Sequence, residues 1–336
     1  MRTYSVLFDV NYLPNFLLLY RSLEKYDNTD FKLYAFCMDE SSYKYLNTEV
    51  KGSTNISVIS IHELLNYFPY LSKLKSERST VEFYFTCSPF ICRYTLDKHP
   101  ESVFTTYLDA DLFFYGNVDV LYDEISHNSI LIFRHNFFGY GKKFLKYGKF
   151  NVGWVTFKND TDGNSCLNRW KNDCQDWCYD YYDNIGNRFG DQKYLDKWDS
   201  LYNSVKVSNN LGANVGPWNI GQYNVTINDF NIIYINNYKL IFYHYASFKP
   251  FFGNFYTTNI SGYLSRPKLI IKKSIYYNYI TELNIITNKI NNTHIIDKLF
   301  ILNKNRKFIN NTFFNIRKLY FYCLKFIFND FLYFKN

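Results

Sequence analysis

The chain has little of several things that mark specialised protein classes. It has only 14 glycines and 7 prolines in 336 residues, which excludes collagen-like and linker-rich architectures. Charged residues make up only 20% of the chain and hydrophobic residues 47%, which excludes a chain that is disordered as a whole. A chain of this length and composition can bury a large core, either as one extended α/β unit or as two packed halves.

Signals for disulfides and for secretion are also missing. The seven cysteines form an odd set without a repeated C-x-x-C pair, which favours reduced thiols packed in the core. Asp9 and Asn11 interrupt the apolar start of the chain, so it lacks the hydrophobic region of a signal peptide. These features predict a cytoplasmic protein.

Acidic residues are scarce in the last quarter of the chain. Residues 261–336 hold 13 lysines and arginines against 3 acidic residues, whereas residues 1–260 hold 25 against 27. The stretch 317–335 interleaves basic with aromatic side chains, and Lys325 and Asp330 interrupt any spanning helix. This pattern suits an anionic membrane surface, at the inner face of the membrane, and equally a helix docked on the body. Nucleic acid is not an expected partner, because no nucleic-acid-binding module accompanies the basic residues.

Short apolar runs alternate with amphipathic stretches in the first half of the chain. The expected strands are 4–9, 31–37, 56–61 and 103–108, and the expected helices are 15–26, 41–46 and 80–98. This alternation predicts a parallel sheet with crossover helices. The pattern becomes mixed later, with strands expected at 130–134, 150–157, 231–235 and 240–244.

Acidic residues stand at the ends of two of the expected strands. Asp9 ends the first strand, and Asp109 and Asp111 follow the run 103–108. Ligands of open α/β sheets bind at the carboxyl ends of strands, so these carboxylates can meet in one crevice. Side chains two positions apart in extended backbone point to the same side, so Asp109 and Asp111 can hold Mg²⁺ or Mn²⁺ together. The alternative is a turn with two solvated aspartates.

The stretch YLDADLFFYGNVDVLYDEI, residues 107–125, resembles the DxD strand of nucleotide-sugar-dependent glycosyltransferases of the GT-A fold. It is most similar to family 8, the glycogenin and lipopolysaccharide galactosyltransferase group. Four further segments agree in order, and together they cover about residues 4–250: LFDVNYLPNFLLLYRSL at 7–23, FNVGW at 150–154, GDQK at 190–193 and HYASFKP at 244–250.

The resemblance implies an α/β fold, a GT-A Rossmann-like mixed sheet flanked by helices, with a basic aromatic C-terminal extension. Residues 1–120 would form a nucleotide-sugar-binding half that ends in the DxD strand. Residues 121–260 would form the acceptor-side half of the same domain, and residues 261–336 the C-terminal segment.

The resemblance also implies the residues of a metal and donor site. The metal, Mn²⁺ or Mg²⁺, would be bound by Asp109, Asp111 and His244, although a histidine at a strand end can also be an ordinary core residue. The expected donor contacts are Asp9, Tyr12, Asp109, Asn151 and Lys249. Lys249 would lie near the diphosphate as a point charge. The family's Arg near the donor phosphates is not matched, since Glu82, Tyr84 and Thr86 occupy that region.

Two further groups are expected beside the sugar and the acceptor. Asp191 and Gln192 match the family's "DQ" element and would position the sugar at its anomeric carbon, as the catalytic pair. Asp191 would serve equally well as a helix N-cap. Trp218 lies in a loop-like stretch, where its ring would either stack on an acceptor sugar or pack in the core.

These implied residues predict a metal-dependent glycosyltransferase of hexose units. It would move a sugar from a nucleoside diphosphate sugar, with a UDP-sugar favoured, to a hydroxyl of a glycan or lipid-linked acceptor in surface glycan or lipopolysaccharide synthesis. Retention of configuration follows from family 8 alone. Two alternatives stay open. A sugar-phosphate nucleotidyltransferase needs a Gly-rich loop that Val10–Pro14 does not supply, and a non-catalytic sugar-binding or membrane-associated protein would tolerate the missing Arg.

Overall fold

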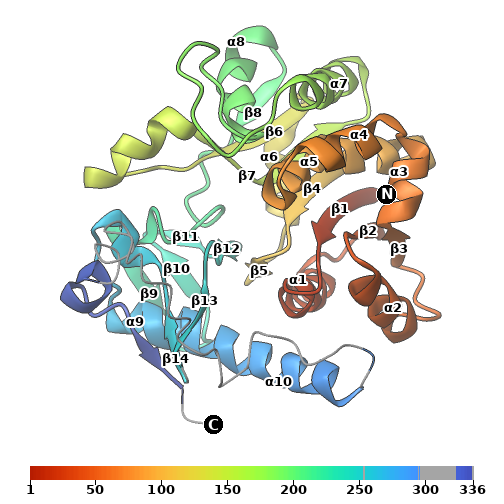
Figure 1. Cartoon of the computed structure of the whole chain (residues 1–336). Helices are drawn as coiled ribbons and strands as arrows, with labels where there is room; N and C mark the ends of the chain where they lie inside the picture. The colour runs from red at the N-terminus through yellow and green to blue at the C-terminus, as the bar shows by residue number, and fades with distance from the viewer. Residues whose placement is uncertain (253, 294, 296–322, 335–336) are drawn as a thin grey trace, which may run out of the picture.

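The computed structural model describes residues 1–252, 254–293, 295 and 323–334. A seven-stranded sheet forms its centre, in the order β3-β2-β1-β4-β7-β6-β8 (Figure 1). The strands are β1 (Arg2–Phe8), β2 (Phe31–Cys37), β3 (Ile56–Ser60), β4 (Phe104–Asp109), β6 (Ile130–Arg134), β7 (Phe150–Lys158) and β8 (Val205–Val207). β1 to β4 pair in parallel, and β7 runs antiparallel to both β4 and β6. The predicted mixed sheet is confirmed.

Helices cover both faces of this sheet, which explains why its inner strands β1, β4 and β7 are buried along almost their whole length. α1 (Leu13–Tyr26) packs on one face, while α5 (Thr80–Lys98) and α7 (Thr161–Asp176) share the other face (Figure 1). α5 begins with a capping box, in which Ser79 and Glu82 satisfy each other's backbone amides. The remaining helices of this part are α2 (Glu40–Glu49), α3 (Ile61–Tyr67), α4 (Tyr70–Glu77), α6 (Asp119–Ile125), α8 (Trp198–Leu201) and the 3₁₀ helices η1 (Gly139–Tyr147), η2 (Gln192–Lys197) and η3 (Ile220–Gln222).

Three smaller sheets accompany the central sheet in the described part of the chain. β5 (Leu112–Phe114) pairs with β12 (Phe242–His244). The other strands form two three-stranded sheets, β9 (Val225–Ile227) with β10 (Ile233–Ile235) and β11 (Tyr238–Lys239), and β13 (Lys249–Phe252) with β14 (Phe255–Thr257) and β15 (Leu332–Tyr333). The helices after them are η4 (Ile260–Tyr263), α9 (Leu269–Ile271), the π-helix η5 (Lys272–Tyr277) and α10 (Asn278–Asn292).

The described part of the C-terminal segment packs on the body. Asn15 of α1 donates a hydrogen bond of 2.8 Å to the Tyr279 hydroxyl of α10. The buried Asp330 accepts hydrogen bonds from Thr258 and Ser261. Of the basic aromatic stretch 317–335, for which a membrane surface is predicted, residues 323–334 are described and the others lie outside the described residues. In the described part of the chain, no helix combines the length and the apolar character needed to cross a membrane.

The strand directions bring the site together. β1, β4 and β6 point the same way, so their carboxyl ends meet at one edge of the sheet, and the antiparallel β7 begins at that edge. Asp9, Asp109, His135 and Asn151 stand at these strand ends. Six of the seven cysteines are buried free thiols, in agreement with their predicted packing role.

Candidate metal and donor site

Two aspartates and a histidine form a compact cluster at the carboxyl edge of β4. Asp109 is the last residue of β4, and Asp111 precedes β5. Because β5 pairs with β12, His244 lies opposite Leu112. His244 Nε2 is 3.0 Å from Asp111 Oδ1 and 3.5 Å from Asp109 Oδ2, and one ligand atom of each residue lies within 4.8 Å of the others. The structure therefore brings the three predicted metal ligands together.

Asn151 fixes the orientation of the His244 ring. The Gly153 amide donates to Asn151 Oδ1 at 3.0 Å, so this atom is an acceptor, and the His244 Nδ1 at 3.3 Å from it carries a proton. In the neutral ring, the lone pair of Nε2 then faces the Asp109 and Asp111 carboxylates. A glycine is required at 153, because a Cβ there would lie 2.6 Å from His244 Nδ1.

This donor set fits a divalent cation. Without one, a neutral His244 would place its lone pair against carboxylate oxygens, and the two aspartates raise the pKa of His244 against the opposing effect of burial. Burial and the neighbouring Asp111 raise the pKa of Asp109, although His244 lowers it. A cation between these atoms would remove both conflicts, and carboxylates with a neutral imidazole suit Mn²⁺.

Tyrosines surround the carboxylates. The Tyr107 hydroxyl donates to Asp109 Oδ1 at 2.8 Å and holds that carboxylate in place. The pKa of the Tyr12 hydroxyl is raised by Asp111 first, then by burial and by Asp109 and Asp9. Tyr12 is 45% exposed at the start of α1, so its ring stands at the rim of the cluster.

Asp9 joins this rim from the end of β1. Its side chain accepts from the Asn11 amide at 2.9 Å, and the Tyr84 hydroxyl lies 3.5 Å from Oδ2. The structure thus places two predicted donor contacts, Asp9 and Tyr12, beside the predicted metal ligands.

Asp191 is buried and lies near Asp109. Burial, reinforced by the charge of Asp109, raises the pKa of Asp191 to about 7, while the Ser88 hydroxyl lowers it. Asp191 stands at the N-cap position of η2, but its side chain makes no capping hydrogen bond. The neighbouring Gln192 donates from Nε2 to the Tyr147 carbonyl at 3.1 Å, which ties it to the end of η1.

Trp218 is only 2% exposed and packs in the wall of the site. Its ring lies edge-on to both His244 and His135, with centroid distances of 5.2 and 5.4 Å. Its Nε1 is buried and has no hydrogen-bond partner among the described residues. Core packing, one of the two predicted settings for Trp218, is the one observed.

His135 is a site residue that the sequence reasoning missed. Asn151 Nδ2 lies 3.3 Å from His135 Nε2, so Asn151 bridges the two histidines. Burial lowers the pKa of His135 to about 3, which keeps it neutral. His135 directly follows the expected strand 130–134, and the rule that pointed to Asp9 and Asp109 would have found it.

Lys249 and Arg93 are the two candidates for contacts to the donor phosphates. Lys249 begins β13, and its side chain lies outside the described part of the chain. Arg93, the nearest arginine after the family's usual position, is bound to Asp97 at 2.6 Å and to Asn164 at 2.7 Å. Arg93 therefore belongs to the α5–α7 packing.

Comparison with known proteins gives two sequence relatives. The uncharacterised protein YfnF of Bacillus subtilis (strain 168) is 30% identical over 239 residues, which are 69% of this chain and 76% of YfnF. The uncharacterised protein YfnD of the same organism is 30% identical over 223 residues, 65% of this chain and 69% of YfnD. No family model matches the chain.

Similar solved structures include several glycosyltransferases. The galactosyltransferase LgtC, solved with donor and acceptor sugar analogues, is 14% identical with a TM-score of 0.44, over 73% of this chain and 87% of LgtC. Mouse xyloside xylosyltransferase 1 is 13% identical with a TM-score of 0.40, over 62% of this chain and 85% of that protein.

Proposed function

We propose that this chain, which belongs to the family of the Bacillus subtilis proteins YfnF and YfnD, is a metal-dependent glycosyltransferase of the GT-A type. It would move a hexose from a nucleoside diphosphate sugar, preferably a UDP-sugar, to a hydroxyl of a glycan or lipid-linked acceptor. The observation that carries this proposal is the cluster of Asp109, Asp111 and His244 at the carboxyl edge of the sheet.

The chain's own residues would divide the work of donor binding. Asp9 and Tyr12, at the rim, would hold the nucleobase. Tyr107 keeps Asp109 fixed, and Asn151 keeps the protonated Nδ1 of His244 away from the ligand position. A cation held by Asp109, Asp111 and His244 would bind the diphosphate and stabilise the charge that develops on it as it leaves. Lys249 is proposed as a further contact to the diphosphate.

Asp191 and Gln192 would position the sugar. Asp191 is buried beside Asp109, where a hydrogen bond to a sugar hydroxyl would replace the water that burial has removed. Gln192 is held by the Tyr147 carbonyl, so its amide is oriented before the sugar arrives. Retention of configuration is part of the proposal through these two residues. We place the reaction in the cytoplasm, at the inner membrane face when the acceptor is lipid-linked.

The loop after β1 favours a transferase over a nucleotidyltransferase. Only four residues, ending with Tyr12 at the N-cap of α1, separate β1 from the helix. None of the four is glycine, so no Gly-rich loop is available to cradle a triphosphate.

Binding of a panel of UDP-, GDP- and CMP-sugars, with and without Mn²⁺, tests the proposal. The wild type should bind one donor only with metal and hydrolyse it slowly. Asp109→Ala should weaken both Mn²⁺ and donor binding at least about 100-fold, as loss of a metal ligand and of its charge requires. Asp229→Ala, at an exposed aspartate, is the matched control. If no nucleotide sugar binds under any metal condition, the proposed function is wrong.

A further inference from the structure

We propose that the basic segment, residues 139–147, binds the phosphate groups of an anionic acceptor. This inference rests on the proposed glycosyl transfer and deepens it by naming the chemical class of the acceptor. The segment is the helix η1, which connects β6 with β7.

Both ends of the basic segment are attached to the site. The chain leaves β6 through His135 and returns through Asn151, and the side chains of these two residues lie 3.3 Å apart. The His135 amide donates to the Lys149 carbonyl at 2.9 Å, which closes the base of the excursion. At its end, the Tyr147 carbonyl accepts the hydrogen bond from Gln192. The segment therefore stands beside the residues proposed to hold the transferred sugar.

The 3₁₀ geometry separates the side chains of the segment into faces. Because residues three apart eclipse one another, Gly141, Phe144 and Tyr147 share one face. Phe144 packs against Tyr263 with ring centroids 5.3 Å apart, and Tyr147 packs against Phe189 at 4.7 Å. This face attaches the segment to the body.

The other faces present lysines and an aromatic ring to solvent. Lys142, Lys143 and Lys146 are exposed, and Tyr140 is 51% exposed. Lys143 Nζ lies 3.7 Å from the centre of the Tyr140 ring. An exposed aromatic face beside an ammonium group can contact both the ring of a sugar and an attached phosphate.

The positive charges of the basic segment are not balanced by acidic residues nearby in the sequence. Residues 134–149 contain Arg134 and four lysines but no acidic residue, although residues 1–260 as a whole are slightly acidic. Lys149 is near Asp196, whose carboxylate accepts from its amide at 2.6 Å. Lys142, Lys143 and Lys146 form no ion pair with any carboxylate that the structure describes. Their mutual repulsion makes an added polyanion favourable.

The donor does not account for these charges. Its diphosphate is assigned to the cation site at Asp109, Asp111 and His244. The three lysines are exposed on η1 and are not part of that cluster. A second anion at the rim is best supplied by the acceptor. We therefore expect a glycan or polyol chain with phosphodiester links, either free or attached to a lipid.

Poly(glycerol phosphate) of defined length is the probe for this inference. The wild type should bind it with an affinity that falls as salt rises. The triple variant Lys142→Gln, Lys143→Gln, Lys146→Gln should bind at least about tenfold more weakly, since three charge-assisted contacts are lost. The control variant Lys51→Gln, Lys75→Gln, Lys98→Gln removes the same charge from exposed lysines of the first 100 residues and should bind within twofold of the wild type.

Further measurements separate this inference from the proposed function. Donor binding with Mn²⁺ should be unchanged in the triple variant, and Asp109→Ala should still bind the polyanion. Unchanged polyanion binding in the triple variant would overturn the inference, and so would loss of donor binding, which would assign the lysines to the donor. Vesicles of phosphatidylglycerol and phosphatidylcholine distinguish the sources: binding to phosphatidylglycerol vesicles without binding to the free polymer would replace the acceptor with a membrane surface.

Discussion

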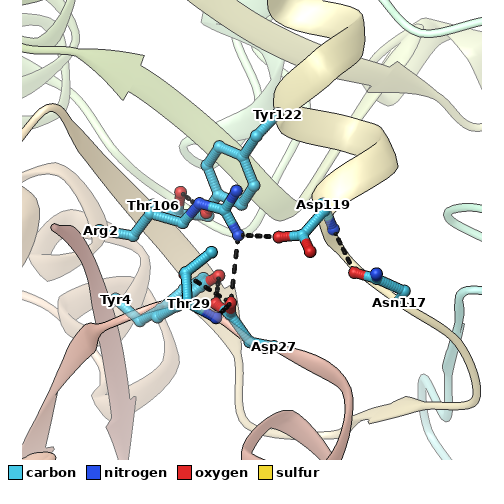
Figure 2. Close-up of polar contacts among 8 residues, drawn as sticks. All are labelled: Arg2, Tyr4, Asp27, Thr29, Thr106, Asn117, Asp119 and Tyr122. Atoms are coloured by element: carbon cyan, nitrogen blue, oxygen red, sulfur yellow. Dashed lines mark hydrogen bonds and ion pairs between the residues drawn. The ribbon is translucent and has the colours of Figure 1, made fainter.

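The charged side chains at the two ends of β1 differ in their partners. At its start, Arg2 pairs with Asp27 at 3.1 Å and with Asp119 at 2.5 Å (Figure 2). Asp27 also accepts hydrogen bonds from the Tyr4 hydroxyl, at 2.6 Å, and from Thr29. At the carboxyl end of β1, Asp109 and Asp111 both lie against His244, and the buried Asp191 lies near Asp109.

This contrast separates a structural network from a functional one. A buried charge with all its partners contributes to the fold, and removal of one partner leaves a desolvated charge behind. Carboxylates crowded around a single imidazole destabilise the fold until a cation arrives, which is the usual state of a binding site. The same sheet therefore carries its stabilising charges at the amino end of β1 and its proposed chemistry at the carboxyl end.

Replacement of Arg2 should give the largest effect on stability. Arg2→Met leaves the buried Asp27 carboxylate without its cation, so we expect the free energy of unfolding to fall by about 3 kcal/mol. Urea unfolding measures it, with Arg21→Met, at an exposed arginine, as the control. Asp111→Asn should leave the metal-free protein as stable as before or more stable. Equal destabilisation by Arg2→Met and Asp111→Asn would remove the distinction between the two ends.

The sequence predicted the site better than it predicted the network at Arg2. Asp9 and Asp109 were found because carboxyl ends of parallel strands converge, and this rule uses only local patterns. Arg2, Asp27 and Asp119 meet only after the chain has folded, across separations of 25 and 117 residues. Local patterns contain no information on such pairs.

The role of Asn151 shows a second limit. The resemblance implies that Asn151 contacts the donor, and the structure shows its amide between His244 and His135. Hydrogen-bond orientation depends on the register between β6 and β7, which shifts between Leu131 and Phe133. Sequence periodicity predicts the existence of these strands, but this register is a property of the folded sheet.

The buried Asp191, near the carboxyl end of β1, should make the stability of the protein depend on pH. The pKa of Asp191 is raised to about 7 from 3.8, so the folded protein retains a proton that the unfolded chain has lost. Stability should therefore fall as pH rises from about 4 to about 7, and Asp191→Asn should abolish that fall. In the presence of a chelator, we expect the unfolding free energy of the variant, relative to that of the wild type, to rise by about 4 kcal/mol between pH 4 and pH 8.

Addition of Mn²⁺ sharpens this test. A cation beside Asp109 favours the charged form of Asp191, so the difference in unfolding free energy between variant and wild type should shrink. Asp229→Asn serves as the control, because its carboxylate is exposed. A difference between Asp191→Asn and wild type that stays constant from pH 4 to pH 8 would show that Asp191 is ionised throughout.

The smallest of these effects is expected at Asn151, a neutral residue whose side chain orients the His244 ring. Asn151→Ala frees the His244 ring and removes the acceptor of the Gly153 amide, so Mn²⁺ affinity should fall about tenfold. Donor affinity should fall with it at limiting Mn²⁺ and recover when Mn²⁺ saturates, if Asn151 acts through His244. A donor defect that persists at saturating Mn²⁺ would instead assign Asn151 to the sugar. Asn164→Ala, in the packing between α5 and α7, should change neither affinity, because its side chain contacts Arg93 rather than the cluster.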